Sequence, residues 1–344
     1  MDRSSILRAS TISDSAFSGA IPAAEKVMKM ATVSLVVPCY NEEEALPAFI
    51  EECSRVVDVM GERFGLQFEM VLVNDGSSDS TLDVMRTAPE LAPNCVVRWF
   101  SLSRNFGKES ALLAGLERAT GDYVAVLDAD MQDPPSLLPE MFEKMQQTNC
   151  DCVATRRADR KGEPVVRSAL SRAFYRLINS MSDTEFVQGE RDFRLMKRQV
   201  VDAILLVTEN NRFSKGIFSW VGFDTEWVAY ENVKRQAGET KWSTRSLFSY
   251  ALDGITAFST TPLQISSAAS LLLFVMFFIA IIVIVVRRIV FGDPVAGWAS
   301  TACIILFVGS VQLFCLGVLG NYLAKTYLET KKRPVYIIKE SSDD

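Results

Sequence analysis

The sequence predicts an α/β fold, in which a mostly parallel sheet domain is followed by a C-terminal hairpin of two transmembrane helices. Over residues 31–155, short apolar runs rich in β-branched residues alternate with segments of helical spacing. Such an alternation favours a parallel sheet with helices on both faces. Two uncharged apolar runs follow near the C-terminus, at about 265–286 and 298–321. Each is long enough to cross a hydrocarbon core about 30 Å thick as a helix.

Five strands and three helices are predicted in the first half of the chain. Each strand is short and apolar, as buried strands are. The five strands are residues 33–37, 68–73, 96–102, 123–127 and 152–155. The first helix is predicted between residues 46 and 60, where apolar residues recur at helical spacing. The other two helices are predicted at 109–120 and 136–147.

Two amphipathic helices are predicted to lie against the membrane surface. The first spans residues 165–181 and the second spans 248–258. Arg167, Arg172 and Arg176 lie largely off the apolar face of the first helix. At a membrane interface these arginines could hold a lipid phosphate. Two other interpretations stay open: the second helix packs on the sheet domain, and the arginines are simply solvated.

The chain is expected to divide into five parts. They are a mobile N-terminal tail (1–30), the sheet domain (31–230), a juxtamembrane loop with an amphipathic helix (231–262), the two transmembrane helices (263–324) and a C-terminal tail (325–344). Lys and Arg residues flank the outer ends of the helix pair, which favours a cytosolic sheet domain and C-terminus. Arg287 and Arg288, in the predicted connector 287–297, argue for the opposite orientation. The first thirty residues lack the apolar core of a secretory signal peptide, which agrees with the cytosolic assignment.

Composition excludes several kinds of chemistry. The net charge is −6, with no long basic stretch, which argues against nucleic acid as a partner. The chain has no histidine, so it lacks the commonest general base and transition-metal ligand. Its seven cysteines are scattered, without a Cys-x-x-Cys pair, which favours reduced thiols over a zinc site or a disulfide framework. Any chemistry must therefore use carboxylates, amides, cations or a bound metal.

Polar residues follow the carboxyl end of every predicted strand. The five polar segments are residues 38–42, 74–79, 104–108, 128–130 and 156–157. In open α/β sheets, ligands bind at the carboxyl ends of the strands. One site shared among these segments is therefore expected.

The sharpest of these signals follows the fourth predicted strand. Asp128 and Asp130 stand one residue apart directly after the strand, and Gln132 follows them. Mg²⁺ and Mn²⁺ prefer oxygen ligands and are readily shared with substrate phosphates. The segment therefore predicts a divalent metal that neutralises charge on a departing nucleotide diphosphate. Asp75 has two compatible interpretations, as a turn residue in Asn-Asp-Gly and as a carboxylate that accepts an N–H of a base.

Taken together, these motifs resemble a known family. PCYNEEEAL, VNDGSSDST, SRNFGKESALLAGL, DADMQDPP and ERDFRL occur in this order ahead of the two apolar runs. In this they resemble the inverting family 2 glycosyltransferases of the GT-A (Rossmann-like) fold. Within that family the chain is similar to the polyisoprenyl-phosphate glycosyltransferases, such as dolichol-phosphate mannose synthase and, more closely, the bactoprenol glucosyltransferases of the GtrB type. The resemblance covers residues 33–336.

The resemblance implies a donor site built from the first four polar segments. Its nucleoside pocket would be lined by Pro38, Tyr40 and Glu42, and Asp75 would read the base. Mg²⁺ or Mn²⁺ and the donor diphosphate would be held by Asp128, Asp130 and Gln132, with Lys108 as a further phosphate contact.

The resemblance also implies an acceptor site made of basic residues. Arg156 and Arg167 would bind the acceptor phosphate, Arg194 and Lys241 would lie near the phosphates, and Arg172 is expected to join them. Asp192 would face the site and touch donor or acceptor. Trp242 stands where the family more usually has Tyr, so a hydroxyl contact is not expected there.

The expected function is inverting transfer of a hexose, in the first place glucose from UDP-glucose, to undecaprenyl phosphate in a bacterial inner membrane, for modification of a cell-envelope glycan. The same chemistry with GDP-mannose, UDP-GlcNAc or a modified arabinose stays open, as do a processive or protein-directed transferase and a non-catalytic nucleotide-binding scaffold. Residues 188–191 begin like the QxxRW signature of processive synthases, but Asp192 replaces the Trp. A phosphate acceptor with a second pKa near ~6 is already anionic, which fits a chain without histidine.

Gly309, Gly317 and Gly320 would permit a homo-oligomer through the second helix.

Overall fold

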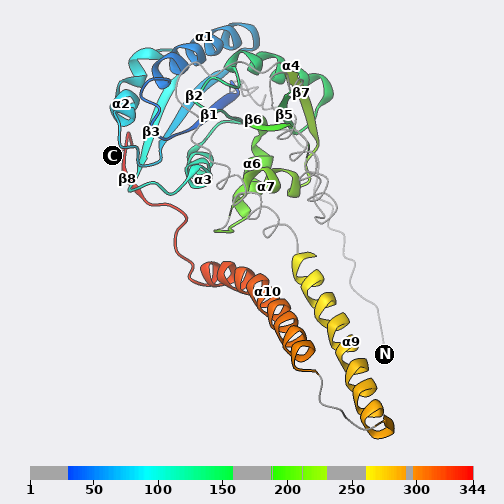
Figure 1. Ribbon diagram of the computed structural model, residues 1–344. Coiled ribbons are helices and arrows are strands. Elements are labelled where there is room, and N and C mark those ends of the chain that lie inside the picture. Colours follow the sequence, from blue (N-terminus) through cyan, green and yellow to red (C-terminus); the bar gives the residue numbers. More distant parts are fainter. Residues whose placement is uncertain are drawn as a thin grey trace, which may run out of the picture. The chain divides into compact units, whose positions relative to one another are not determined.

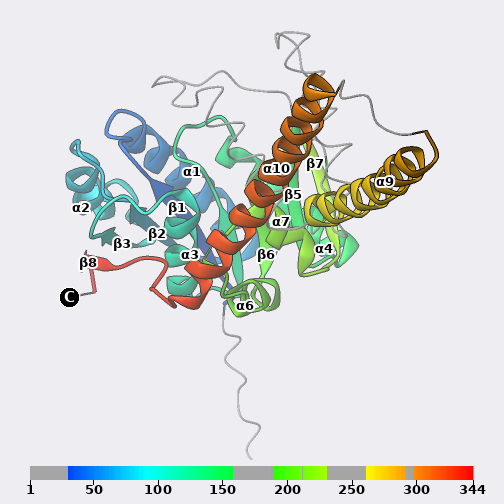
Figure 2. The ribbon, with the colours of Figure 1, turned by 60° about the horizontal axis from the view of Figure 1, so that its bottom comes forward.

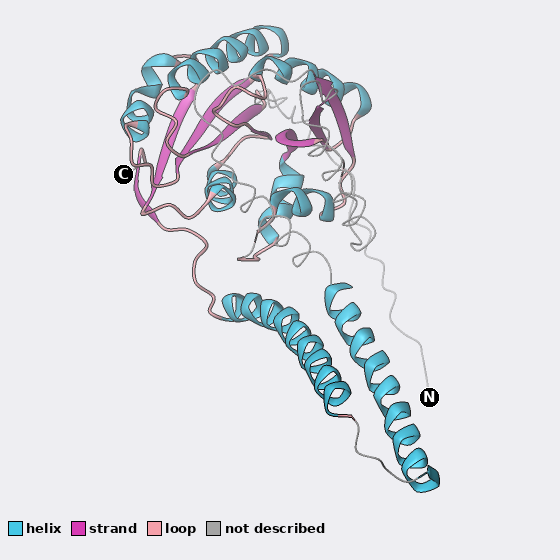
Figure 3. Ribbon diagram, in the orientation of Figure 1, coloured by secondary structure: helices cyan, strands magenta, loops and turns pink. Residues whose placement is uncertain are grey.

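The computed structural model describes residues 30–157, 187, 189–210, 212–230, 261–291 and 297–343. These residues form one eight-stranded sheet with the strand order β7-β5-β6-β4-β1-β2-β3-β8 (Figures 1 and 3). The strands are β1 (Thr32–Cys39), β2 (Gln67–Asn74), β3 (Val96–Leu102), β4 (Tyr123–Val126), β5 (Cys152–Arg157), β6 (Glu190–Lys197), β7 (Thr225–Tyr230) and β8 (Ile338–Ser341). The first five correspond to the five strands that the sequence predicts.

The strand β1 lies inside a parallel part of the sheet. It pairs with β2 on one side and β4 on the other, and β2 pairs with β3, all in parallel. Side chains alternate along a strand, so Leu35 packs into one apolar core and Val36 into the other. Burial on both faces explains why these strands appear in the sequence as continuous apolar runs. The predicted mostly parallel sheet is confirmed.

The strand β6 was not predicted, and it changes which residues meet. It lies between β4 and β5 and is antiparallel to both. The strands β4 and β5 therefore still run in one direction, and the carboxyl ends of β1 to β5 share one edge of the sheet. The amino end of β6 lies at that same edge. Residues 190–192 thus join the polar segments that the sequence places there.

Helices cover both faces of the sheet, as predicted (Figures 1 and 2). One face packs against α1 (Leu46–Phe64), α2 (Thr81–Leu91) and α4 (Leu138–Thr148), the last preceded by a short 3₁₀ turn, η1 (Pro135–Leu137). The other face packs against α3 (Lys108–Arg118), α6 (Arg198–Leu206) and α7 (Ser214–Trp220). The helices α1, α3 and α4 correspond to the three that the sequence predicts.

Two long helices, α9 (Thr261–Phe291) and α10 (Trp298–Thr330), occupy the apolar C-terminal part of the chain. Both are longer than the predicted spans. Arg287 and Arg288 belong to α9 rather than to the predicted connector, because Arg is a good helix former and a charge does not end a helix. Within the described residues, one helical stretch, Phe307–Thr330, is long and apolar enough to cross a membrane. A crossing by both helices stays a prediction.

The end of the chain returns to the sheet. After α10 it forms β8, which pairs antiparallel with β3, and the sequence did not predict this strand. Several other predictions lie outside the described residues. They are the N-terminal tail, both amphipathic helices, and the acceptor-site residues Arg167, Arg172 and Lys241.

Candidate active site

The loops after β1 and β2 are fastened to each other at the carboxyl edge of the sheet. Asn41 has a positive φ of 53°; its side-chain oxygen accepts the N–H of Ser78 at 2.9 Å, and its own N–H donates to Ser77 Oγ at 3.0 Å. The N–H of Glu42 donates to Thr81 Oγ1 at 2.8 Å. The segment with the predicted nucleoside residues is therefore rigidly placed. Within it, Pro38 and Glu42 are half-buried and Tyr40 is exposed.

Asp75 is buried and holds the loop that leads into α3. Its two carboxylate oxygens accept the backbone N–H groups of Phe106, at 2.7 Å, and Gly107, at 3.0 Å. Burial raises the pKa of Asp75, and these two hydrogen bonds oppose the rise. Gly76 beside it has φ +63°, and a Cβ there would lie 2.3 Å from the carbonyl carbon of Arg104, so the close approach of the loop requires glycine. Contact of Asp75 with a base stays a prediction.

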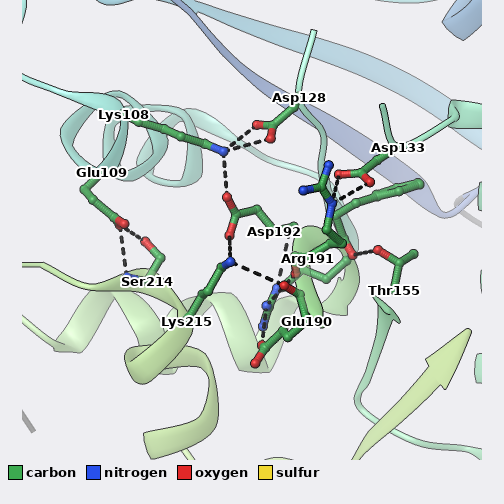
Figure 4. A network of polar contacts seen from close by, with 12 residues as sticks. Lys108, Glu109, Asp128, Asp133, Thr155, Glu190, Arg191, Asp192, Ser214 and Lys215 are labelled. Atoms are coloured by element: carbon green, nitrogen blue, oxygen red, sulfur yellow. Dashed lines mark hydrogen bonds and ion pairs between the residues drawn. The ribbon is translucent and has the colours of Figure 1, made fainter. Parts of the chain in front are cut away.

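Lys108 joins two of the predicted site carboxylates (Figure 4). Its Nζ lies 2.7 Å from Oδ1 and 2.8 Å from Oδ2 of Asp128, at the end of β4. The same Nζ lies 2.6 Å from Oδ2 of Asp192, near the start of β6. The three residues come from distant parts of the chain. The structure therefore brings together Lys108, Asp128 and Asp192, as a shared site requires.

The charges around Asp192 decide its ionisation. Burial alone would raise the pKa of this carboxyl, but the nearby charges of Lys108 and Lys215 and the hydrogen bond from Lys108 outweigh it and hold the pKa well below its usual range. Asp192 is therefore anionic at any physiological pH. A carboxylate with so low a pKa is a poor proton acceptor, so Asp192 is better suited to hold cations than to act as a general base.

Asp130 and Gln132 lie on a tight turn after β4. Met131 between them has φ 59°, and the N–H of Gln132 donates to Asp130 Oδ1 at 3.1 Å. The next carboxylate, Asp133, is fully buried. It accepts Arg191 Nε at 2.8 Å and 3.1 Å through its two oxygens, and it also accepts the hydroxyl of Tyr230.

Arg191 links this buried carboxylate to the predicted site. Besides Asp133, it donates to Oε1 of Gln132 at 3.1 Å. Burial raises the pKa of Asp133, and the charge and hydrogen bond of Arg191 oppose the rise. Sequence reasoning gave neither Asp133 nor Arg191 a role, although both belong to motifs that carry the family resemblance. The pair of Asp133 and Arg191 fixes the turn that bears Asp130 and Gln132.

The donor set of this turn fits a hard divalent cation. Asp128, Asp130 and Gln132 offer only oxygen ligands from their carboxylate and amide groups, which suits Mg²⁺ or Mn²⁺. Within the described residues, no three His, Cys, Asp or Glu side chains are placed to hold a metal by themselves. Mg²⁺ commonly takes some of its ligands from substrate phosphates, which suits a donor set of this kind.

The two described arginines of the predicted acceptor site lie in different surroundings. Arg156 is exposed, and its Cα pairs in register with that of Glu190, so it lies at the same edge of the sheet. Arg194 is 2% exposed. It donates to Glu190 Oε1 at 2.8 Å, and its guanidinium lies 3.5 Å from the ring centre of Phe218. Arg194 thus supports the start of β6 from within the domain, and its contact with an acceptor phosphate stays a prediction.

Two residues near Asp192 were missed by sequence reasoning. Lys215 of α7 lies with its Nζ 3.9 Å from Asp192 Oδ1. Glu109 accepts the N–H of Ser214 at 3.0 Å and also the Ser214 hydroxyl. Glu109 lies in the motif that contains Lys108, but nothing in that motif points to Ser214, and Lys215 lies outside every quoted motif. Only the packing of α3, β6 and α7 brings them together.

Comparison with known proteins places this chain in a family. Residues 34–205 match the family model described as glycosyl transferase family 2. CsbB of Bacillus subtilis is 40% identical over 316 residues, which are 92% of this chain and 93% of that protein. The prophage bactoprenol glucosyl transferase homolog of Escherichia coli K12 and the bactoprenol glucosyl transferase of Shigella phage SfX are each 42% identical over 307 residues, which are 89% of this chain and 98% of theirs.

Likeness to solved structures is more distant than likeness to these relatives. Glucosyl-3-phosphoglycerate synthase from Mycobacterium tuberculosis aligns with a TM-score of 0.42 and 18% identity, covering 66% of this chain and 78% of that one. The family model and the relatives at about 40% identity over most of the chain therefore carry the assignment. This chain belongs to glycosyl transferase family 2.

Proposed function

We propose that this protein transfers glucose from UDP-glucose to a polyisoprenyl phosphate, undecaprenyl phosphate in a bacterium, with inversion at the anomeric carbon. One observation carries the proposal. Relatives named as bactoprenol glucosyl transferases, or as homologs of them, are 42% identical, and the match spans 98% of their own length. The match also takes in 89% of this chain, so the likeness extends beyond residues 34–205 that match the family model.

The donor would lie across the carboxyl edge of the sheet. Pro38 lies near the end of β1, and Tyr40 and Glu42 lie on the fastened loop that follows, where the three can line a nucleoside pocket beside Asp75. Asp128, Asp130 and Gln132 would hold Mg²⁺ or Mn²⁺, which when bound would neutralise negative charge on the donor diphosphate. Lys108, whose ammonium already lies against Asp128, adds a further positive charge for that diphosphate.

The acceptor needs positioning more than proton transfer. A phosphate monoester is largely dianionic near neutral pH, since its second pKa is about 6. Its oxygen forms the new bond to the anomeric carbon while the bond from that carbon to the UDP oxygen breaks, and UDP leaves with the electron pair. No proton has to be removed, which agrees with a carboxylate at Asp192 that is a poor base. Arg156, exposed at the same edge, would bind the acceptor phosphate together with Arg167 and Arg172.

The acceptor lipid also requires a membrane next to the site. We infer that α9 and α10 anchor the protein in the inner membrane, with the sheet domain in the cytosol. The long apolar stretch Phe307–Thr330 and the lipid-linked acceptor in the names of the relatives support this inference.

A panel of labelled donors tests the proposal. Membranes that contain the protein are incubated with radiolabelled UDP-glucose, GDP-mannose or UDP-GlcNAc, with and without EDTA, and then extracted with organic solvent. We expect label from UDP-glucose in the lipid fraction, its release by mild acid, and its loss in EDTA. Transfer from GDP-mannose or UDP-GlcNAc, and not from UDP-glucose, would show that the donor sugar is mannose or GlcNAc rather than glucose. Label in material that neither extracts nor yields to mild acid would favour a processive or protein-directed transferase.

A further inference from the structure

We propose that Lys215 is a positioning residue for this reaction, which holds Asp192 from the side opposite Lys108. The inference rests on the proposed function, because it assigns a task within glycosyl transfer. Lys215 lies outside every motif that carries the family resemblance. It lies near the amino end of α7, a helix that the sequence did not predict.

Each oxygen of Asp192 faces a different ammonium group (Figure 4). Lys108 Nζ is 2.6 Å from Oδ2, and Lys215 Nζ is 3.9 Å from Oδ1. The first contact is a hydrogen-bonded ion pair, whereas the second is a longer electrostatic contact. With a cation on each side, the Asp192 carboxylate has one preferred orientation, which directs Oδ2 toward Lys108.

Lys215 is itself held in place by the start of β6. Its ammonium donates to the backbone carbonyl of Glu190 at 3.3 Å. The Glu190 side chain is fixed in turn by buried Arg194 at 2.8 Å. The side chains of Lys215 and Asp192 are 24% and 22% exposed, so solvent screens their attraction less than it screens a surface pair. The Lys215 ammonium therefore has a defined position beneath Asp192.

A second contact fixes α7 relative to α3. Glu109 follows Lys108 in α3 and accepts both the N–H and the hydroxyl of Ser214, which precedes Lys215 in α7. The two lysines are thus next to two residues that bind each other. This link holds α3 and α7 together, so the positions of Lys108 and Lys215 relative to Asp192 are fixed together.

The result is a row of alternating charges, Asp128, Lys108, Asp192 and Lys215 (Figure 4). Its first member belongs to the turn that would hold the metal and the donor diphosphate. If Lys215 is removed, Asp192 keeps one cation and can rotate, so Lys108 loses one of the two carboxylates that set its direction. Misplacement by about 1 Å of a group that orients a substrate can slow a reaction about 100-fold, so the loss should appear in kcat more than in the KM for UDP-glucose.

A double-mutant cycle between Lys215 and Asp192 tests this role. Lys215→Met keeps the length of the side chain without its charge, and we expect it to lower kcat by about 10- to 50-fold with little change in Tm. Lys215→Arg restores the charge and should recover most of the activity. In an Asp192→Asn background, Lys215→Met should lower kcat further by less than about 2-fold, because the carboxylate that Lys215 holds is already absent.

Lys144 supplies a matched control. Its ammonium also contacts a backbone carbonyl, that of Trp227 at 2.9 Å, and a carboxylate, that of Glu226 at 3.0 Å. Lys144→Met removes the same kind of contact from α4 and β7, and it should leave kcat unchanged. An equal loss of kcat in Lys144→Met would show a general effect of lost charge and would overturn the inference.

The outcomes separate this inference from the proposed function. A wild-type protein that transfers a different sugar overturns the glucose assignment, and the cycle is then run with that sugar. Independent effects of Lys215→Met and Asp192→Asn on kcat, or full activity of Lys215→Met with the working donor, overturn the role of Lys215 and leave the transferase assignment intact.

Discussion

At the scale of single residues, the site is defined by charges that neighbours hold in place. Asp75 accepts hydrogen bonds from two backbone N–H groups. Asp133 accepts hydrogen bonds from Arg191 and Tyr230. Asp192 forms ion pairs with Lys108 and Lys215. Each of these carboxylates shapes a loop or an ion pair rather than standing open to solvent. Asp128 is also paired, with Lys108, and it lies with Asp130 in the segment after β4 that has the donor set of a metal site.

Asp130→Asn tests that assignment. The substitution keeps the size of the side chain and removes the charge that a metal requires, so we expect transfer to fall by at least about 100-fold, with UDP binding only partly weakened. Transfer is measured with labelled donor, and UDP binding by calorimetry. Asp202→Asn on α6, whose side chain is 62% exposed, is the matched control. Normal transfer by Asp130→Asn would contradict the assignment of Asp130 as a metal ligand.

Asp192→Asn should reveal the depressed pKa through the pH dependence of stability. A carboxyl with a lowered folded-state pKa stabilises the protein above its unfolded pKa of about 3.9, and this contribution declines as pH falls below that value. We therefore expect the Tm difference between wild type and Asp192→Asn to be constant from about pH 6 to 8 and to shrink below about pH 4. A Tm difference between wild type and Asp192→Asn that grows as the pH falls would contradict the ion pairs of Asp192 with Lys108 and Lys215.

At the scale of elements, β8 connects the end of α10 to the loop that leads to Lys108. Ser342 exchanges hydrogen bonds with Trp99, through its N–H at 2.9 Å and its hydroxyl at 3.0 Å. The N–H of Ser103, directly before that loop, donates to the carbonyl of Ile337 at 2.8 Å. Asp343 pairs with Arg98. The strand therefore covers the edge of β3, which would otherwise expose unpaired backbone groups.

Removal of residues 337–344 should destabilise both the sheet edge and the loop. We expect the Tm to fall by about 5 °C, amides of residues 96–107 to exchange faster with deuterium, and the KM for the donor to rise. Glu340→Gln serves as the control: it removes the ion pair with Arg86, a solvent-exposed pair that contributes little to stability. Unchanged deuterium exchange at the amides of residues 103–107 would show that β8 does not stabilise the loop.

The end of α10 has a second attachment to the sheet domain. Glu329 accepts the backbone N–H of Asn210 at 2.8 Å and the Asn210 side-chain amide at 3.1 Å. Asn210 lies in the segment that leads into α7, the helix of Lys215. The apolar helix is therefore tied to the domain through both β8 and the approach to α7, two routes that lead to Lys108 and Lys215.

At the scale of the whole molecule, the apolar surface of α9 and α10 determines where the protein can work. Large side chains such as Leu313, Leu316 and Leu319 are more than half exposed, which in water would be a large unfavourable apolar area. The proposed lipid acceptor provides a reason for that surface, since a polyisoprenyl chain cannot leave the bilayer.

An alkaline carbonate wash of membranes tests the anchoring. We expect the wild-type protein to stay in the membrane pellet. Leu316→Asp combined with Leu319→Asp should release it, because each carboxylate inside a spanning helix costs about 2.5–3.5 kcal/mol. Leu206→Asp, at a leucine of the sheet domain that is 82% exposed, should have no effect. Release of the wild-type protein by the wash would contradict a transmembrane anchor.

Much of the fold could be predicted from sequence because its evidence is local. The strands β1 to β5 are largely apolar runs, since burial on both faces favours apolar residues along their length. The helix α1 follows from a spacing that puts Leu46, Phe49 and Ile50 on one side. The strands β6, β7 and β8 escaped prediction because their apolar residues are interrupted by charges, such as Arg191 and Asp192, whose partners lie far away in the chain.

The sequence by itself determined the α/β class, the polar segments at the carboxyl edge, the apolar C-terminal helices and the family, because periodicity and ordered motifs are properties of neighbouring residues. Only the tertiary structure decided which charges meet. The antiparallel insertion of β6 brings Asp192 to Lys108 and Asp128, and the packing of α7 adds Lys215. The ion pair between Lys108 and Asp192, 84 positions apart in the chain, leaves no pattern in either segment, because its energy depends on a distance that only folding sets.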